Sequence, residues 1–257
     1  TEEDQDLADR ISKLADDLDA PMAQRSGTPI GDTKTVTVDG KERTVFNSNG
    51  KPIHPTVEGV ENFWRWFGDS KVVDKQGRPL VVYHGTKADF AEFDPKKRGT
   101  RTDNGFFGSG FYFTTDDDVA SLYAGHGFAE RGNIMPVYLK IDNPFNFNER
   151  PPEYAEKYGT RGNLLAEESA GFTEWAKGLG YDGSSAPGWN QYVVFDPTQI
   201  KSATGNSGDF DPSNPSILAQ KPTSTIPVKT GKLRTDRVAA ALKKLVPNLE
   251  IIAPKTK

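Results

Sequence analysis

The sequence predicts an α+β protein with two packed, mostly antiparallel sheets and a few peripheral helices. Short apolar runs bounded by Gly, Pro, Asn and Asp recur along the chain, and only a few segments between them show helical periodicity. Hydrophobic residues make up 35% of the 257 residues, and the mean hydropathy is −0.64, which is enough apolar material for one core. Strands punctuated by so few helices favour this fold class over a parallel, doubly wound sheet.

We expect one core domain with additional segments at the two ends, because the chain is longer than one average domain but too short for two. The expected parts are an N-terminal helix and hairpin arm at residues 1–56, the core domain at 57–206, and a linker with a C-terminal amphipathic helix at 207–257. Gly, Ser, Pro, Asn and Thr dominate residues 203–229, which is typical of a linker. An apolar stripe over residues 238–245 predicts the final helix.

The arm is expected to contain a helix and a hairpin. Leu7, Ile11, Leu14 and Leu18 form one apolar stripe, which predicts an amphipathic helix. The alternating runs at 35–38 and 43–46, separated by the turn around Asp39-Gly40, predict a β-hairpin. Two strands alone are marginally stable, so the hairpin is expected to pack on the core domain or extend it.

The core domain is expected to open with a helix from Thr56, whose apolar residues recur at helical spacing until Gly68. The apolar run from Leu80 predicts a buried strand that carries His84 to the rim of a cleft, where Gly85 lets the backbone approach a ligand. A second hairpin is expected between residues 71–73 and this strand.

A second strand with a candidate site residue, Tyr112, is expected at residues 111–114. Thr115 is expected to cap the helix that follows, which carries Tyr123 eleven positions after Tyr112. Further on, we expect a strand at 134–141 with Pro136 at an edge or bulge, a loop around 151–152, a helix at 164–179, and a strand at 191–195.

Composition excludes several classes of function. The chain has 32 basic and 36 acidic residues and no cysteine, so it lacks a global basic field for nucleic acid and has no disulfide or thiolate metal site. Its three histidines lack the spacing of metal ligands, and no apolar run approaches the roughly 18 residues that span a membrane. We therefore expect no metal and no membrane span, in a cytoplasmic protein or one delivered into a host cell. Because the chain begins at Thr1 without a signal-peptide pattern, we interpret it as a fragment or processed product of a larger protein.

Three motifs resemble those of a known superfamily. They are His84-Gly85-Thr86, the segment from Gly108 to Thr114, and Tyr123 at its eleven-residue spacing. Together they resemble the His-Tyr-Glu type of ADP-ribosyltransferase, and most closely the ADP-ribosyltransferase domains in large polyvalent proteins of bacteriophages and mobile elements. The likeness runs from about residue 63 to about residue 206, through Tyr181-Asp182-Gly183 and the strand that begins at Gln191.

The resemblance implies that the protein uses NAD as substrate, releases nicotinamide and transfers ADP-ribose to a protein or nucleic-acid acceptor. It implies that His84 binds the adenosine ribose, that the backbone of Gly85 binds the carboxamide, and that Tyr112 and Tyr123 hold the nicotinamide ring. A flat cationic ring between tyrosine faces gains stacking and cation–π attraction. Thr86 and Ser121 are polar auxiliaries, while Tyr83 and Tyr192 are assigned to the core.

A basic cluster, Lys96, Lys97, Arg98 and Arg101, follows the first motif. Two interpretations remain open with equal weight: a donor-side flap in which Arg98 and Arg101 bind the pyrophosphate of NAD, or a solvated loop.

Gln191 departs from the family pattern, which has glutamate at this position. An amide still donates and accepts hydrogen bonds but cannot act as a base, so we expect reduced activity, whether the glutamine is natural or engineered. The residue two positions earlier is Trp189, so the Glu-x-Glu and Gln-x-Glu patterns of arginine-modifying toxins are absent. The expected catalytic residues are therefore His84, Tyr112 and Gln191. The alternatives are a retired module that binds NAD or ADP-ribose within a larger polyprotein, and an NAD glycohydrolase.

Overall fold

The computed structural model describes residues 27–88, 90–98, 105–125 and 132–218. Within these residues the strands are β1 (Thr35–Val38), β2 (Lys41–Thr44), β3 (Val82–Thr86), β4 (Phe111–Thr114), β5 (Asn133–Leu139), β6 (Pro144–Asn146), β7 (Gly183–Ala186), β8 (Gln191–Val194) and β9 (Ile200–Ser202). The α-helices are α2 (Val57–Phe67), α3 (Asp117–Tyr123), α4 (Pro152–Tyr158) and α5 (Ser169–Gly178), and the 3-10 turns are η2 (Pro95–Lys97), η3 (Ala166–Glu168), η4 (Pro187–Trp189) and η5 (Pro197–Gln199). The helices expected at 2–19 and 238–245 lie outside the described residues.

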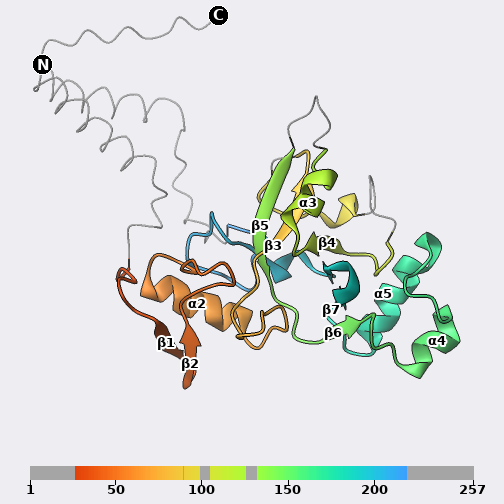
Figure 1. Cartoon of the computed structure of the whole chain (residues 1–257), viewed down its shortest axis with the longest axis horizontal. Coiled ribbons are helices and arrows are strands. Elements are labelled where there is room, and N and C mark those ends of the chain that lie inside the picture. The colour runs from red at the N-terminus through yellow and green to blue at the C-terminus, as the bar shows by residue number, and fades with distance from the viewer. Residues whose placement is uncertain (1–26, 89, 99–104, 126–131, 219–257) are drawn as a thin grey trace, which may run out of the picture. The chain divides into compact units, whose positions relative to one another are not determined.

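The α+β architecture with mostly antiparallel strands is confirmed. Seven strands form one sheet in the order β6-β7-β8-β4-β3-β5-β9, in which only the described pair β6–β7 is parallel, and β1 and β2 form a second sheet. The seven strands divide into two halves, because β3 and β4 share the single aligned pair Tyr83–Thr114. Figure 1 shows α2 and the hairpin at one end of this sheet and α4 and α5 at the other.

The hairpin and α2 form as their sequences predict. Asp39 and Gly40 both have positive φ, 50° and 75°, which is the geometry of a type I′ turn. Thr56 caps α2 by accepting a hydrogen bond from the Gly59 nitrogen, and Gly68 ends the helix at φ 59°. The apolar side chains of α2 and the hairpin share one core cluster, so the hairpin packs on the core domain.

Three clusters of buried side chains hold the fold together. The first joins α2 to the hairpin and to Tyr138 of β5. The second covers the face of the sheet to which Phe113 and Val194 point. The third lies between α4, α5 and the opposite face, to which Val193 points. The alternation of β8 thus sends neighbouring residues into different clusters.

Several local expectations are wrong. The chain around Pro152 forms α4 rather than a loop, because proline is well suited to the first turn of a helix. Asp116, not Thr115, caps α3. The expected edge position of Pro136, by contrast, is confirmed locally, because β5 pairs with β3 on one side but with β9 on the other side only from Val137 onward. The second hairpin forms in a short version, as an antiparallel bridge between Val73 and Pro79 with backbone hydrogen bonds from Asp74 N to Arg78 O and from Leu80 N to Val72 O.

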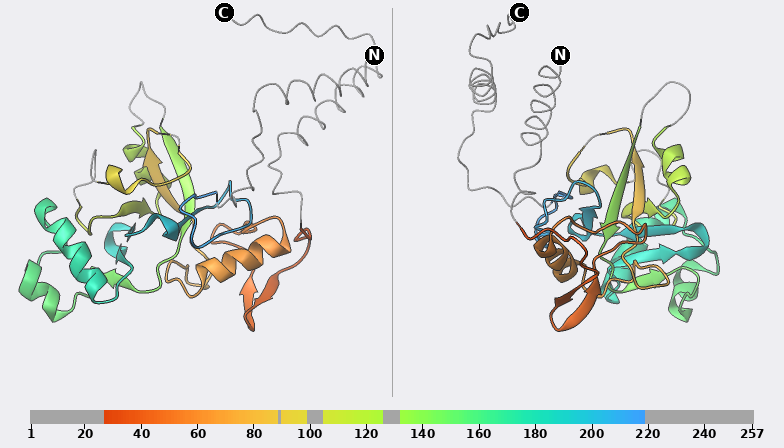
Figure 2. Two further views of the ribbon diagram at one scale, coloured as in Figure 1. Left: turned by 180° about the vertical axis from the view of Figure 1, so that it is seen from behind. Right: turned by 60° about the vertical axis from the view of Figure 1, so that its left-hand side comes forward.

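The linker expected from residue 207 is also wrong over its described part. Phe210 is buried in the first cluster and Ile217 in the second. The backbone nitrogen of Ile217 donates to Ala91 O, and that of Ser202 donates to Ile217 O. Residues 203–218, which we call the strap, therefore belong to the core domain, and Figure 2 shows this last coloured segment, in blue, running beside the sheet.

Candidate active site

His84 lies in β3 with its imidazole on the face of the second cluster. Its Nδ1 is 2.9 Å from the carbonyl oxygen of Tyr112, and its ring centroid is 5.0 Å from Phe93 and 5.5 Å from Phe113. A carbonyl only accepts hydrogen bonds, so Nδ1 carries the hydrogen. Burial lowers the pKa of His84, although the Tyr112 carbonyl acts in the opposite direction. The imidazole is therefore neutral at pH 7, with Nε2 left as an acceptor.

Gly85 is the point at which α3 approaches β3. A Cβ atom added here would lie 1.9 Å from the carbonyl oxygen of Ala120 and 2.9 Å from the nitrogen of Ala124. Both are backbone atoms of α3 and its cap, so a side chain would force the helix to move. Gly85 consequently has a packing role of its own, and it sets the position of the helix that carries Tyr123.

Tyr112 is held by the loop that precedes β4. Its hydroxyl donates to Gly108 O at 2.8 Å and accepts from the Phe107 nitrogen at 3.0 Å. Gly108 has φ 110°, which an L side chain rarely adopts. The ring packs against the third cluster. The loop is thus closed by Tyr112 itself.

Tyr123 ends α3 with 49% of its surface exposed. Thr86, by contrast, uses its hydroxyl locally and accepts a hydrogen bond from the Ala88 nitrogen at 3.1 Å. Tyr123 therefore presents an open ring, while Thr86 is engaged in a turn.

Gln191 begins β8 opposite Thr114 of β4. Because directly opposed residues share a face and strands alternate, Gln191, Thr114 and Tyr112 lie on one face, whereas Tyr192 packs in the second cluster. The side chain of Gln191 is half-buried and forms no hydrogen bond with any described residue. Asn190 just before it is in the left-handed region, at φ 54°.

The expected site residues lie around the junction of β3 and β4, but on opposite faces of the sheet. His84 points to the face of Phe113, while Tyr112 and Gln191 point to the opposite one. The strands share no aligned pair beyond Tyr83–Thr114, so they separate where His84 and Gly85 lie. Separated strands leave backbone groups in need of another partner.

Arg98 closes over the His84 face. Its guanidinium lies 5.2 Å from the ring centroid of Phe111, and its Nε is buried without a hydrogen-bond partner among the described residues. Phe90 and Phe93, from the same segment, both contact the imidazole of His84. Phe90, Phe93 and Arg98 thus pack at the His84 face, whereas Lys96 and Lys97 are exposed, so both interpretations of the basic cluster stay open; we call residues 90–98 the flap. Arg101 lies outside the described residues.

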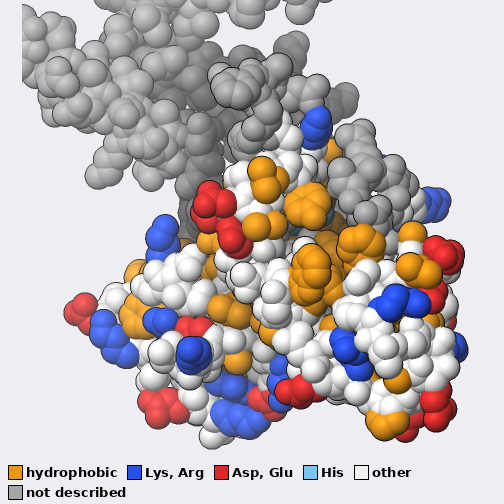
Figure 3. All heavy atoms as spheres, turned by 45° about the vertical axis from the view of Figure 1, so that its right-hand side comes forward, with side chains coloured by type: hydrophobic (Ala, Val, Ile, Leu, Met, Phe, Trp, Pro, Cys, Tyr) orange, Lys and Arg blue, Asp and Glu red, His pale blue; other side chains and the backbone are white. Residues whose placement is uncertain are grey.

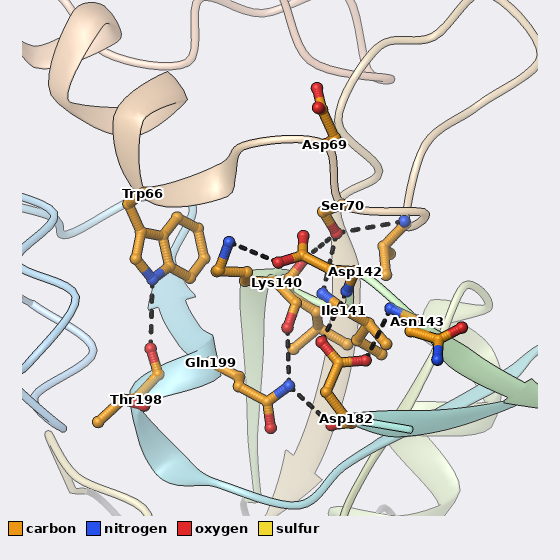
Figure 4. A network of polar contacts seen from close by, with 12 residues as sticks. Trp66, Asp69, Ser70, Lys140, Ile141, Asp142, Asn143, Asp182, Thr198 and Gln199 are labelled. Atoms are coloured by element: carbon orange, nitrogen blue, oxygen red, sulfur yellow. Dashed lines mark hydrogen bonds and ion pairs between the residues drawn. The ribbon is translucent and has the colours of Figure 1, made fainter. Parts of the chain in front are cut away.

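Asp182 and Asp196, the two acids nearest to Gln191 in the sequence, have structural roles. Asp182 accepts hydrogen bonds from the backbone nitrogens of Asp142 and Asn143 at 2.7 and 2.8 Å, as Figure 4 shows. Gln199 in the same network donates to the carbonyl of Asp182. Asp196 caps η5 by accepting from Thr198. Both carboxylates are engaged in turns, so neither replaces the missing glutamate.

The contacts that hold the flap could not be anticipated from local sequence. Lys201 is fully buried on β9, and its Nζ donates to the carbonyls of Asn214 and Ser216. Ser216 in turn bridges Glu92 of the flap. A lysine on a short strand before a Gly- and Ser-rich segment carries no local signal of burial, because the groups that surround it are distant in sequence.

The described residues contain no group of three or more His, Asp or Glu that could hold a metal ion. No helix in the same ranges is long and apolar enough to cross a membrane.

The model of the family described as ADP-ribosyltransferase in polyvalent proteins matches residues 74–210. The chain belongs to this family. The match spans β3, β4, β8 and the strap as far as Phe210, so it covers every candidate site residue of this ADP-ribosyltransferase domain. No curated protein and no solved structure matches the chain.

Proposed function

We propose that this domain is an NAD-dependent ADP-ribosyltransferase that transfers ADP-ribose to a macromolecular acceptor and releases nicotinamide. The observation that carries the proposal is the cross-strand pair Gln191–Thr114, which puts the amide of Gln191 on the same face as Tyr112. The family resemblance implies a glutamate in this position. A side chain there acts on the ribose of NAD held at the β3–β4 junction.

The binding roles follow from the atoms that the fold leaves available. The unprotonated Nε2 of His84 accepts a hydrogen bond from a ribose hydroxyl, and the backbone of Gly85, where β3 leaves β4, binds the carboxamide. The exposed ring of Tyr123 covers the nicotinamide. The buried Nε of Arg98 donates to the pyrophosphate and thereby gains the partner that it lacks.

In the reaction, the bond between the ribose carbon and the nicotinamide nitrogen breaks, and its electron pair leaves with nicotinamide. The ribose becomes an oxocarbenium-like cation, which the acceptor attacks while losing a proton to water. Gln191 stabilises this cation through its carbonyl oxygen but cannot take the proton. A carboxylate ~4 Å from the cation contributes about 1 kcal/mol in water and about 4 at an effective dielectric of 20. The glutamine form is therefore about fivefold to a thousandfold slower.

The test is the rate of nicotinamide release by the wild type and by Gln191→Glu. The variant should turn over faster with little change in NAD affinity, because charge favours the cation more than ground-state NAD. Gln76→Glu, the same exchange in an exposed turn, is the matched control, and His84→Ala in the Gln191→Glu background should lose activity. Equal rates for both forms, with NAD bound normally by each, would reject this role of Gln191.

A second candidate function is a retired module that binds NAD or ADP-ribose without turnover. The observation that favours it is Gln191 itself, because an amide cannot take the proton of the acceptor. Incubation with adenylate-labelled NAD, followed by mass spectrometry of proteins, nucleic acids and free ADP-ribose, separates transferase, glycohydrolase and retired module. Binding without any labelled product in either form would select the retired module.

A further inference from the structure

The end of the strap pairs with the flap. Glu92 of the flap and Ser216 of the strap form an antiparallel bridge, and the backbone nitrogen of Ile217 donates a hydrogen bond to Ala91 O at 2.8 Å. We call this bridge and this hydrogen bond the latch. Ile217 is 4% exposed and lies in the second cluster with Phe93 of the flap. The latch thus joins two segments that are distant in sequence and share one core.

The strap side of the latch is held in place by β9 and the residues that follow it. The Lys201 ammonium donates to the carbonyl of Ser216 at 3.1 Å. The carbonyl of Ile217 accepts a hydrogen bond from the Ser202 nitrogen at 2.8 Å and another from the side-chain amide of Asn206 at 3.1 Å. The strap is therefore fixed at the residues that the flap meets.

The latch sets how the flap meets His84. Side chains alternate along an extended segment, so the bridge at Glu92, whose side chain is exposed, turns Phe93 inward. Phe93 is 3% exposed, and its ring centroid lies 5.0 Å from that of the imidazole at an interplanar angle of 74°. The imidazole is held at Nδ1 by the Tyr112 carbonyl and beside its ring by Phe93. Its Nε2, which accepts the ribose hydroxyl in the proposed function, therefore depends on the flap for its position.

The strap side of the latch lies outside the part of the chain that the family model covers, because the match ends at residue 210. We propose that Ser216 and Ile217 are positioning residues for NAD: through the latch they hold the flap against His84 and so pre-organise the ribose site. A site segment that leaves its binding position lowers the apparent affinity in proportion to the fraction of molecules in which it has left. This inference rests on the proposed function and adds the segment that sets the affinity for NAD.

The first test is a reversible disulfide across the latch. The hydrogen bond from Ile217 to Ala91 makes Glu92 and Ser216 a non-hydrogen-bonded pair, and the Cα atoms of such pairs lie about 4.5 Å apart. This separation suits a disulfide, and the chain has no cysteine of its own. The oxidised form of the double variant Glu92→Cys, Ser216→Cys should bind NAD at least as tightly as its reduced form in isothermal titration calorimetry. Weaker binding by the oxidised form would overturn the proposal, since it would show that the flap must leave the strap when NAD binds.

The second test weakens the latch and then restores it. Ile217→Ala should raise the dissociation constant of NAD about tenfold, which corresponds to a latched flap in about one-tenth of the molecules. Ile217→Val should retain most of the affinity. When Ile217→Ala is added to the double variant, oxidation should restore the affinity, because the disulfide replaces the lost packing. A loss of affinity that oxidation fails to restore would come from damage elsewhere in the fold and would overturn the proposal.

The matched control is Phe210→Ala. This substitution removes a buried ring from the same strap, but from the first cluster, which contains neither His84 nor any residue of the flap. It should leave the affinity for NAD unchanged at temperatures well below the melting of both variants, although it lowers stability. Equal effects of Ile217→Ala and Phe210→Ala on the dissociation constant of NAD would overturn the proposal.

Limited digestion with trypsin reports on the flap without NAD. Lys96 and Lys97 of the flap are exposed, and basic side chains are spread over the face shown in Figure 3, so the cleavage sites are assigned by mass spectrometry. Cleavage after Lys96 and Lys97 should be faster in Ile217→Ala than in Phe210→Ala. Normal NAD binding with equal cleavage in these two variants would reject the latch alone. Faster cleavage in Ile217→Ala with no NAD binding by any form would reject the proposed function, and the positioning of NAD with it.

Discussion

Replacing Lys201 by methionine should change how the stability of the protein depends on pH. Lys201 is fully buried on β9, and its ammonium donates to the carbonyls of Asn214 and Ser216 in the strap. Burial lowers its pKa from 10.5 to about 8, although the Asp211 carboxylate acts to raise it. Methionine keeps the length of the side chain and removes the titrating group.

The size of the effect follows from the two pKa values. A fall from 10.5 to about 8, at 1.36 kcal/mol per pKa unit, corresponds to about 3 kcal/mol. Below about pH 8 both the folded and the unfolded protein carry the proton, so the cost of burying the charge is fully present. Between about pH 8 and about pH 10.5 the unfolded chain holds a proton that the folded protein has lost. Stability therefore rises with pH in this window.

The assay is urea denaturation of the wild type and Lys201→Met at several pH values across this window. The difference in the free energy of unfolding between the two should move by about 3 kcal/mol in favour of the wild type as pH rises. Lys75→Met, in an exposed turn, is the control and should show no such trend. A difference that stays constant with pH would refute the argument that Lys201 titrates with a lowered pKa in the folded protein.

Two further predictions concern the position of α3 and the extent of the domain. Gly85→Ala places a methyl group 1.9 Å from Ala120 O, so α3 must shift and move Tyr123 with it. Isothermal titration calorimetry should therefore show weaker NAD binding. An unchanged affinity for NAD would contradict the role of α3 in the site. A chain ending at Lys221, the limit of the compact unit, should have the same melting temperature as the full-length protein. A chain ending at Ser207 lacks the buried Phe210 and should lose about 3 to 5 kcal/mol of stability. Equal melting of the two truncated forms would show that the strap does not stabilise the domain.

Elements whose signals are local could be predicted from the sequence. The caps and apolar spacing of α2, the turn at Asp39-Gly40 and the alternation of β8 are properties of neighbouring residues, and each formed as expected. The same is true of the motifs around His84 and Tyr112, because a strand and a glycine can be recognised without knowing what they pack against.

The face of the sheet that each site residue occupies depends on how distant strands pair. The register Tyr83–Thr114 sends His84 and Tyr112 to opposite faces, and shifting it by one residue would reverse the relation. No local pattern contains that register, since it is set by strands far apart in the chain.

The strap is a second feature that local sequence could not predict. Its Gly, Ser, Asn and Pro content is that of a linker, yet Phe210 and Ile217 anchor it in two clusters and the buried ammonium of Lys201 binds its carbonyls. Composition reports how easily a segment folds on its own. It does not report the partners that the rest of the chain supplies, and here those partners supply the burial and hydrogen bonds that order the segment.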